Sequence, residues 1–357
     1  MQIIEHTYKS NLPIKYVFSE GKANKDYLVV VFSAFSPEKA DIKYSYNYIR
    51  SLQHIDCHRL YILDNFGPRG CYYLGANMDF EVETCVNSLI SFFTRKYMIS
   101  QNNVITAGSS KGGSAALYFG LKYHYGHIIA GAPQTKIADY VLNSAKDTAA
   151  YIFGECHPSR ESIQKLDSII FEQLDKEIVS ELHLLSSEND SQFNVHIKPF
   201  LDLLDQKGIK GHVQINNEIK NHSQIAKHFP YFLQKVLYQL FGIDFEKSVI
   251  FCRDHLQKTY YYSIANNHIC FKLDCHQLQE VEYAFYIILD NQVLEKVMYQ
   301  DDPELVFPIT RHGSYRIHYF VRSKQNGEKI SNKTHEIEFT PTLVNSGLKL
   351  IEREGSI

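Results

Sequence analysis

The stretch VITAGSSKGGSAAL, from Val104 to Leu117, decides the fold of this chain. Its first four residues are apolar or β-branched, GSSKG follows at positions 108–112, and a small-residue helical pattern begins at Gly112. A GxSxG motif between a buried strand and a helix is typical of a sharp turn that lifts a serine hydroxyl above a parallel sheet. The glycines are needed because side chains there would clash with the neighbouring strand and helix. Ser110 is therefore the predicted nucleophile.

The turn also predicts how a reaction intermediate would be stabilised. Ser110 comes at a helix N-terminus, where the backbone dipole favours negative charge, and the amide of Lys111 is expected to face a tetrahedral oxyanion. The Lys111 side chain is expected to point to solvent or substrate rather than act as a base. The second oxyanion donor is expected from the loop after the apolar run 27–32, from the amide of Ala34 or a neighbour. Ser109 is the alternative nucleophile, but it lacks the glycine framing.

A serine hydroxyl needs a base that is oriented by an acid, and in this kind of fold the chain order is serine, acid, histidine. His222 follows the last predicted strand and opens the last helix of the first half, which is where the base belongs. His228 is the second choice, while His212 lies within the strand. The acid should follow the strand 182–185, where Asp190 is favoured over Glu188. Asp190 could equally be a helix N-cap.

The first half, up to about Gly242, alternates short apolar strands with longer helical patterns, which indicates βαβ units and a mostly parallel sheet. The expected strands are 27–32, 60–63, 104–107, 127–130, 182–185 and 212–215. The expected helices are 44–52, 80–96, 112–123, 193–207 and 223–240, with an amphipathic helix over 159–180. We expect an α/β-hydrolase domain over 1–245, with a possible cap insertion at 151–180.

After about Phe245 the pattern changes to period-2 alternation with turn signals between the runs. Strands are expected at 258–264, 268–273, 282–289 and 313–321, with turns at 290–291, 312–313 and 326–327. Several short strands without helices between them predict a small β-sandwich over 246–345, followed by a tail at 346–357.

Composition excludes several classes of function. Lys and Arg number 37 against 40 Asp and Glu, and this near-neutral balance gives no basis for nucleic-acid binding. The seven cysteines are scattered without a CxxC pair, so no zinc ribbon is supported and a reducing compartment is favoured. The first residues show no signal peptide, and no apolar run approaches the roughly 20 residues that span a bilayer. We therefore expect a cytoplasmic protein with no membrane span, cofactor or metal, and the oligomeric state stays open.

The loop 64–73, DNFGPRGCYY, follows the strand that ends near Leu63. It lies at the carboxyl edge of the predicted sheet, where ligands bind in such folds. Arg69 and Tyr72 are candidate substrate contacts, although they could equally stabilise the conformation of this loop. Phe35, in the loop after the strand 27–32, is a further candidate.

At these residues the chain resembles a branch of the α/β hydrolases, namely the capsular polysaccharide biosynthesis proteins of the XcbB/CpsF type. It is more distantly similar to the accessory Sec system protein that O-acetylates glycans on serine-rich adhesins. The stretches that carry the resemblance are 64–73, VITAGSSKGG at 104–113 and the turn at 221–222. YAFYI at 283–287 and GSYRI at 313–317 resemble a tyrosine-rich, Ig-like module called "three Y". The resemblance implies a serine triad and a role in surface glycan assembly.

Three functional hypotheses follow. The first is a serine esterase or O-acyltransferase that acts on a bacterial surface polysaccharide or its acylated saccharide precursor. The second is a catalytically silent scaffold whose β module binds glycan or capsule-assembly proteins. The third is a serine peptidase of the same fold.

Overall fold

The computed structural model describes residues 3–35, 44–53, 55–243, 260–265, 267–273, 278, 280–325 and 327–339. The chain divides into two compact units, Met1–Leu237 and Tyr238–Ile357. The predicted domain boundary near residue 245 and the predicted tail at 346–357 lie outside the described residues.

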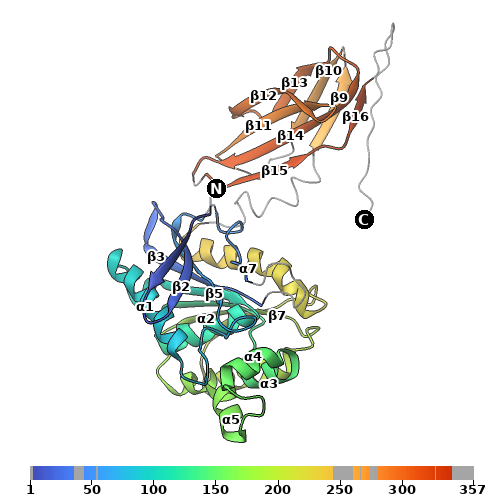
Figure 1. The fold of residues 1–357 in the computed structure, drawn as a ribbon. Helices are drawn as coiled ribbons and strands as arrows, with labels where there is room; N and C mark the ends of the chain where they lie inside the picture. Colours follow the sequence, from blue (N-terminus) through green and yellow to red (C-terminus); the bar gives the residue numbers. More distant parts are fainter. Residues whose placement is uncertain are drawn as a thin grey trace. The chain divides into compact units, whose positions relative to one another are not determined.

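An eight-stranded sheet with the order β1-β2-β4-β3-β5-β6-β7-β8 forms the centre of the first unit (Figure 1). Its strands are β1 (Glu5–Lys9), β2 (Pro13–Ser19), β3 (Asn24–Phe32), β4 (Cys57–Ile62), β5 (Val104–Ser109), β6 (His127–Gly131), β7 (Glu181–Ser186) and β8 (Gly211–Ile215). β3 to β8 pair in parallel, and β1 and β2 extend one edge in antiparallel fashion. All six strands predicted from the sequence form. β1 and β2 were not predicted, because neither carries an apolar run as long as that of β3.

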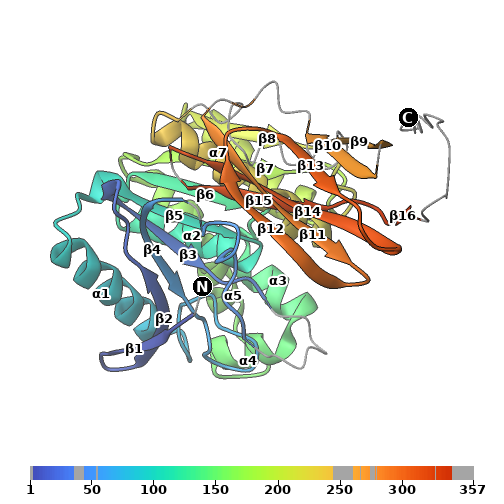
Figure 2. The same ribbon diagram turned by 90° about the horizontal axis from the view of Figure 1, so that it is seen from above.

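Helices cover both faces of this sheet (Figures 1 and 2). α7 (Ile225–Leu240) lies on one face, and α1 (Glu81–Lys96) and α2 (Lys111–Lys122) lie on the other. The core on the second face also includes residues of α3 (Ile137–Ser144), α4 (Lys146–Phe153), α5 (Arg160–Ser168) and α6 (Lys198–Gln206). No helix in the described part of the chain is long and apolar enough to cross a membrane.

Two of the expected helices differ from the structure. The expected helix 44–52 is wrong, because this segment forms bends and turns in which Tyr48 has a φ of 62°. The expected helix 159–180 ends early: α5 stops at Ser168, and a 3-10 turn follows at Phe171–Asp175. Ser159 caps α5 as its hydroxyl accepts from the Ser162 amide. α3 and α4 precede it and were not predicted, because each is only eight residues long and too short to show a helical period.

The second unit contains two antiparallel sheets. β9 (Tyr260–Ala265), β10 (His268–Leu273) and β13 (Glu304–Pro308) form the smaller one, in the order β13-β10-β9. The larger one has the order β12-β11-β14-β15, and β16 also pairs with β14. Its strands are β11 (Val281–Leu289), β12 (Gln292–Gln300), β14 (Gly313–Ser323), β15 (Lys329–Lys333) and β16 (Ile337–Phe339). Apolar residues from both sheets form one cluster. The Ig-like topology expected for this unit remains a prediction.

Candidate active site

Ser110 occupies a strained turn between β5 and α2. Its φ of 53° and ψ of −124° lie outside the regions that L-residues normally adopt. A Cβ at Gly108 would lie 2.4 Å from the backbone of Gly112, and one at Gly112 would lie 2.5 Å from the carbonyl oxygen of Phe32. The backbone therefore leaves no room for a side chain on either side of the serine. The strained turn projects the Ser110 hydroxyl at the carboxyl edge of the sheet.

The structure brings Ser110, His222 and Asp190 together at this edge. Nε2 of His222 lies 2.8 Å from Oγ of Ser110, and its Nδ1 lies 2.7 Å from Oδ2 of Asp190. His222 opens a 3-10 turn (His222–Gln224) after β8, and Asp190 lies in the turn after β7. The fully buried Asp190 carboxylate also accepts from the amide of Gln192 at 2.9 Å. This chain of contacts can move the serine proton to the imidazole and stabilise the resulting imidazolium.

The alternative residues lie elsewhere. Glu188 is exposed, and His228 is part of α7. Ser109 is buried at the end of β5, where its Oγ lies 2.5 Å from the hydroxyl of Tyr48. Burial raises the pKa of Tyr48 to about 12, so this phenol stays protonated. None of these groups contacts the Ser110 hydroxyl in the described part of the chain.

The two predicted oxyanion donors differ in their surroundings. The amide of Lys111 is in the first turn of α2, where backbone N–H groups have no partner within the helix. The amide of Ala34 instead donates to Oδ1 of Asn47 at 2.8 Å. An oxyanion that binds the Ala34 amide must therefore displace the Asn47 side chain.

The expectation that the Lys111 side chain points to solvent or substrate is wrong. Its Nζ lies 2.6 Å from Oδ2 of Asp64, and both side chains are at most 1% exposed. The same carboxylate oxygen accepts from the amides of Cys71 and Tyr73. The ammonium also lies 4.9 Å from the centre of the Tyr73 ring. The buried ion pair between Lys111 and Asp64 thus joins the nucleophile turn to the loop 64–73. This pairing was not evident from the sequence.

Gln134, which sequence reasoning missed, contacts the nucleophile directly. Its Nε2 donates to Oγ of Ser110 at 3.0 Å and to Oε1 of Gln192 at 3.2 Å. Its Oε1 accepts from the hydroxyl of Tyr72 at 2.7 Å. Tyr72 is 1% exposed, so it lies beneath the site and not on a surface that substrate can contact. Only its position in the chain could have indicated this contact, because Gln134 follows β6 at the same edge of the sheet as Ser110.

Phe35 and Arg69 contact each other next to the buried Lys111 side chain. The Arg69 guanidinium is 5.3 Å from the centre of the Phe35 ring, and the Tyr140 ring of α3 stacks on the same ring at 5.8 Å. Phe35 and Arg69 are both half-buried. The arrangement offers an aromatic surface with a cation beside it. It lies close to the nucleophile turn, because Nζ of Lys111 is 5.5 Å from the centre of the Phe35 ring.

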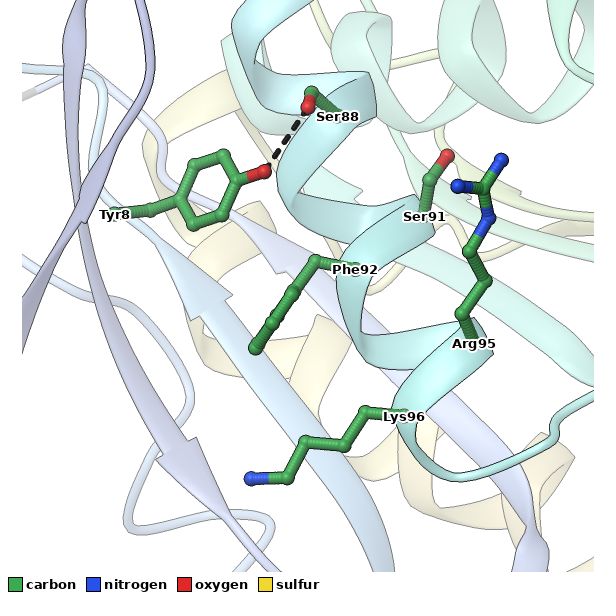
Figure 3. A pocket seen from close by; sticks show the side chains of 6 residues that line it. All are labelled: Tyr8, Ser88, Ser91, Phe92, Arg95 and Lys96. Carbon is green, nitrogen blue, oxygen red and sulfur yellow. Dashed lines mark hydrogen bonds between the residues drawn. The ribbon is translucent and has the colours of Figure 1, made fainter.

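A separate shallow hollow lies between β1 and α1 (Figure 3). The hydroxyl of Tyr8 lies 3.1 Å from Oγ of Ser88, and the Phe92 ring is exposed beside it. The residues that line it are Tyr8, Ser88, Ser91, Phe92, Arg95 and Lys96. It contains none of the residues gathered around Ser110.

Fold and site together define the class: the first unit has the fold of the α/β hydrolases, as the sequence predicted. No protein-family model matches this chain, and no curated protein matches it significantly in sequence. Among solved structures it is similar to the capsule O-acetyltransferase of Neisseria meningitidis serogroup A. A point variant of that enzyme in complex with CoA is 22% identical and has a TM-score of 0.55, with 65% of this chain and 94% of that chain covered.

Two other structures share the fold. The Gap123 glycosylation-associated protein complex of Streptococcus agalactiae is 18% identical, with a TM-score of 0.53 over 67% of this chain and 47% of that one. FphF, a fluorophosphonate-binding serine hydrolase of Staphylococcus aureus, is 11% identical, with a TM-score of 0.50 over 67% of this chain and 98% of that one.

Proposed function

We propose that this chain is a serine O-acyltransferase that transfers an acyl group to a saccharide of a bacterial capsule or related surface glycan, and that it acts as an esterase when water replaces the saccharide. The observation that carries the proposal is the alignment of Ser110, His222 and Asp190 at 2.8 and 2.7 Å on a strained turn. Such a turn costs about 1–3 kcal/mol and persists where the surrounding structure holds it, as at nucleophiles.

The residues support a two-step reaction. Ser110 Oγ attacks the acyl carbonyl while His222 takes the hydroxyl proton, and buried Asp190 stabilises the imidazolium. The amide of Lys111 donates to the oxyanion, together with that of Ala34 once Asn47 has moved away. The intermediate then collapses as the bond to the leaving group breaks, and the leaving group takes the proton from His222. A sugar hydroxyl or water next attacks the acyl-serine carbonyl and gives its proton to His222. The bond to Ser110 Oγ then breaks, and Ser110 takes the proton back from His222.

The proposed donor is an acyl-CoA thioester, and the proposed acceptor is a saccharide hydroxyl. The similarity to a capsule O-acetyltransferase that has been captured with CoA supports both choices. The aromatic ring of Phe35 beside Arg69 offers stacking for a ring and a cation for an anionic group. We further propose that the helices α3–α5 limit the access of water to the acyl-enzyme. The second unit, for which we propose an Ig-like sandwich, would hold the glycan chain or a capsule-assembly protein.

Covalent labelling tests the nucleophile. Full-length protein, Ser110→Ala and Ser109→Ala are treated with a fluorophosphonate probe and assayed with 4-nitrophenyl acetate. We expect the wild type and Ser109→Ala to be labelled, and Ser110→Ala to lose labelling and at least about 10³-fold in ester turnover. Equal labelling of Ser110→Ala would refute the triad. Absence of labelling in all three folded proteins would favour the scaffold hypothesis.

Acyl transfer is tested next. Wild-type protein and Ser110→Ala are mixed with acetyl-CoA. Intact mass spectrometry is expected to detect an added acetyl group on the wild type alone, which capsular oligosaccharide then removes as O-acetyl sugar. If acetyl groups pass only to water, whatever saccharide is present, the chain is an esterase and the transferase proposal fails. If only peptide amides are cleaved, the chain is a peptidase.

A further inference from the structure

Three histidines and a glutamate gather at the edge of the sheet opposite to Ser110. His127 begins β6, Glu181 and His183 come at the start of β7, and His212 comes at the start of β8. Since the triad follows the carboxyl ends of these parallel strands, the cluster lies at their amino ends. No step of the proposed reaction uses it.

Strand register places all four side chains on one face. His127 pairs with Glu181 across β6 and β7, and His183 pairs with His212 across β7 and β8. Residues paired across parallel strands share a face, and so do residues two apart along a strand. Ile128 and Leu182 belong to the core of the opposite face, so the cluster lies on the face that α7 covers.

The nitrogen–oxygen distances from the three histidines to Glu181 match the spacing of ligands around a metal ion. Nδ1 of His127 lies 3.2 Å from Glu181 Oε2. Nε2 of His183 and Nε2 of His212 lie 3.2 and 3.1 Å from Glu181 Oε1. With metal–ligand bonds of about 2.0–2.1 Å, neighbouring ligand atoms of a tetrahedral zinc ion are about 3.3 Å apart. The ligand atoms of His127, Glu181 and His183 all lie within 4.8 Å of one another. His212 is not part of this group, so its exposed side chain must turn toward the other three to become a fourth ligand.

Two of these ring nitrogens lack a satisfactory protein partner. His127 Nδ1 and His183 Nε2 are buried and have no group in hydrogen-bond geometry within the described part of the chain, although both lie near the Glu181 carboxylate. His183 is 6% exposed, and its ring stacks on that of His212 with the centres 4.9 Å apart. Nitrogen and carboxylate lone pairs that face one another at this distance repel each other unless the nitrogen carries a proton or a metal ion lies between them.

We propose that His127, Glu181 and His183 form a structural site for a first-row transition metal, most suitably Zn²⁺, with His212 as the fourth ligand once its exposed side chain turns toward them. Three imidazoles and one carboxylate are ligands that zinc prefers, and four protein ligands fill a tetrahedral site as structural zinc sites do. His212 is largely exposed, so the ion can enter from solvent. A metal ion bound by these residues would link the exposed edge strand β8 to β7 and β6 and so stabilise this edge of the sheet. No metal was expected from the sequence, because the four residues lie on three separate strands and form no compact motif.

Metal binding to the full-length, tag-free protein tests this proposal, and it does not depend on activity at Ser110. After treatment with a chelator, Zn²⁺ is titrated by calorimetry and Co²⁺ by visible absorption. We expect one ion per chain, the intense absorption of tetrahedral Co²⁺ and a higher Tm with Zn²⁺. His212→Gln, at an exposed position that tolerates substitution, and Glu181→Gln should each weaken binding at least about 10-fold.

His157→Gln is the matched control, because His157 is exposed and lies away from these strands, next to Cys156. It should bind zinc as the wild type does. The proposal is overturned if the wild type binds no stoichiometric Zn²⁺, if Co²⁺ shows only the weak spectrum of a hydrated ion, or if His212→Gln and Glu181→Gln bind as tightly as the wild type. In that case the cluster is a group of imidazoles that share protons with Glu181.

Discussion

At the scale of single residues, the Ser110 hydroxyl lies between two nitrogens with different tasks. His222 Nε2 accepts its proton, and Gln134 Nε2 donates to its oxygen at 3.0 Å. A donor at the oxygen leaves the hydroxyl hydrogen directed to the imidazole. Tyr72 in turn fixes the Gln134 amide, because its hydroxyl donates to Oε1 and so leaves Nε2 for the serine. Gln134 therefore acts as a positioning residue in the proposed reaction.

Replacing Gln134 with Ala should slow fluorophosphonate labelling about 3- to 10-fold, since one neutral hydrogen bond contributes about 0.5–1.5 kcal/mol. Tyr72→Phe removes only the second link and should have a smaller effect. The second-order rate of labelling measures both, with circular dichroism as the check on folding. If folded Gln134→Ala reacts as fast as the wild type, Gln134 has no positioning role.

Asn47 offers a second test at this scale, because its side chain accepts from the Ala34 amide that an oxyanion would use. Asn47→Ala frees this amide for the oxyanion. It should raise kcat/KM for 4-nitrophenyl acetate several-fold, because one neutral hydrogen bond contributes about 0.5–1.5 kcal/mol. Asn47→Asp places a negative charge on the amide and should lower kcat/KM. A fall in both variants would mean that Asn47 supports the reaction instead of competing with it.

At the scale of elements, the buried pair of Lys111 and Asp64 holds the loop 64–73 against the start of α2. Removing one partner leaves a buried charge, which costs about 3–5 kcal/mol. We expect Lys111→Met to lose this much in free energy of unfolding, measured with urea, and Lys111→Met/Asp64→Asn to recover a large part of it. If the double variant is no more stable than Lys111→Met, the pair is not what holds the loop.

Elements also show which features the sequence could predict. The strands β3 to β8 and the position of Ser110 follow from apolar periodicity and one local motif. The histidine and acid choices follow from chain order, and the structure places His222 and Asp190 beside Ser110. Gln134 is in an irregular loop without periodicity, and the His127–His212 cluster depends on strand pairing. The segment 44–52 has a helical pattern, but its turns carry Tyr48 and Asn47 to the site instead.

At the scale of the whole molecule, stability should depend on pH through buried histidines. His196 is 3% exposed, and burial lowers its pKa to about 4 from the ordinary value of 6.5. Its Nδ1 accepts from the amide of Lys136 at 3.3 Å, which only the neutral ring can do. Between pH 6.5 and 4 the unfolded chain therefore binds a proton that the folded chain does not. Folding free energy is lost as the pH falls through this window, and the loss from this group is complete below about pH 4.

The change that isolates this group is His196→Gln, which keeps an acceptor for Lys136 but does not titrate. Because other histidines also have lowered pKa values, including His58 and His318, the difference between variant and wild type is the relevant quantity. We expect the wild type to lose roughly 1–3 kcal/mol more than His196→Gln between pH 7 and 4.5. The chain has no tryptophan, so urea unfolding is followed by circular dichroism. The exposed control His157→Gln should follow the wild type, and a His196→Gln curve parallel to both would show that His196 is already protonated in the folded protein or that its pKa is ordinary.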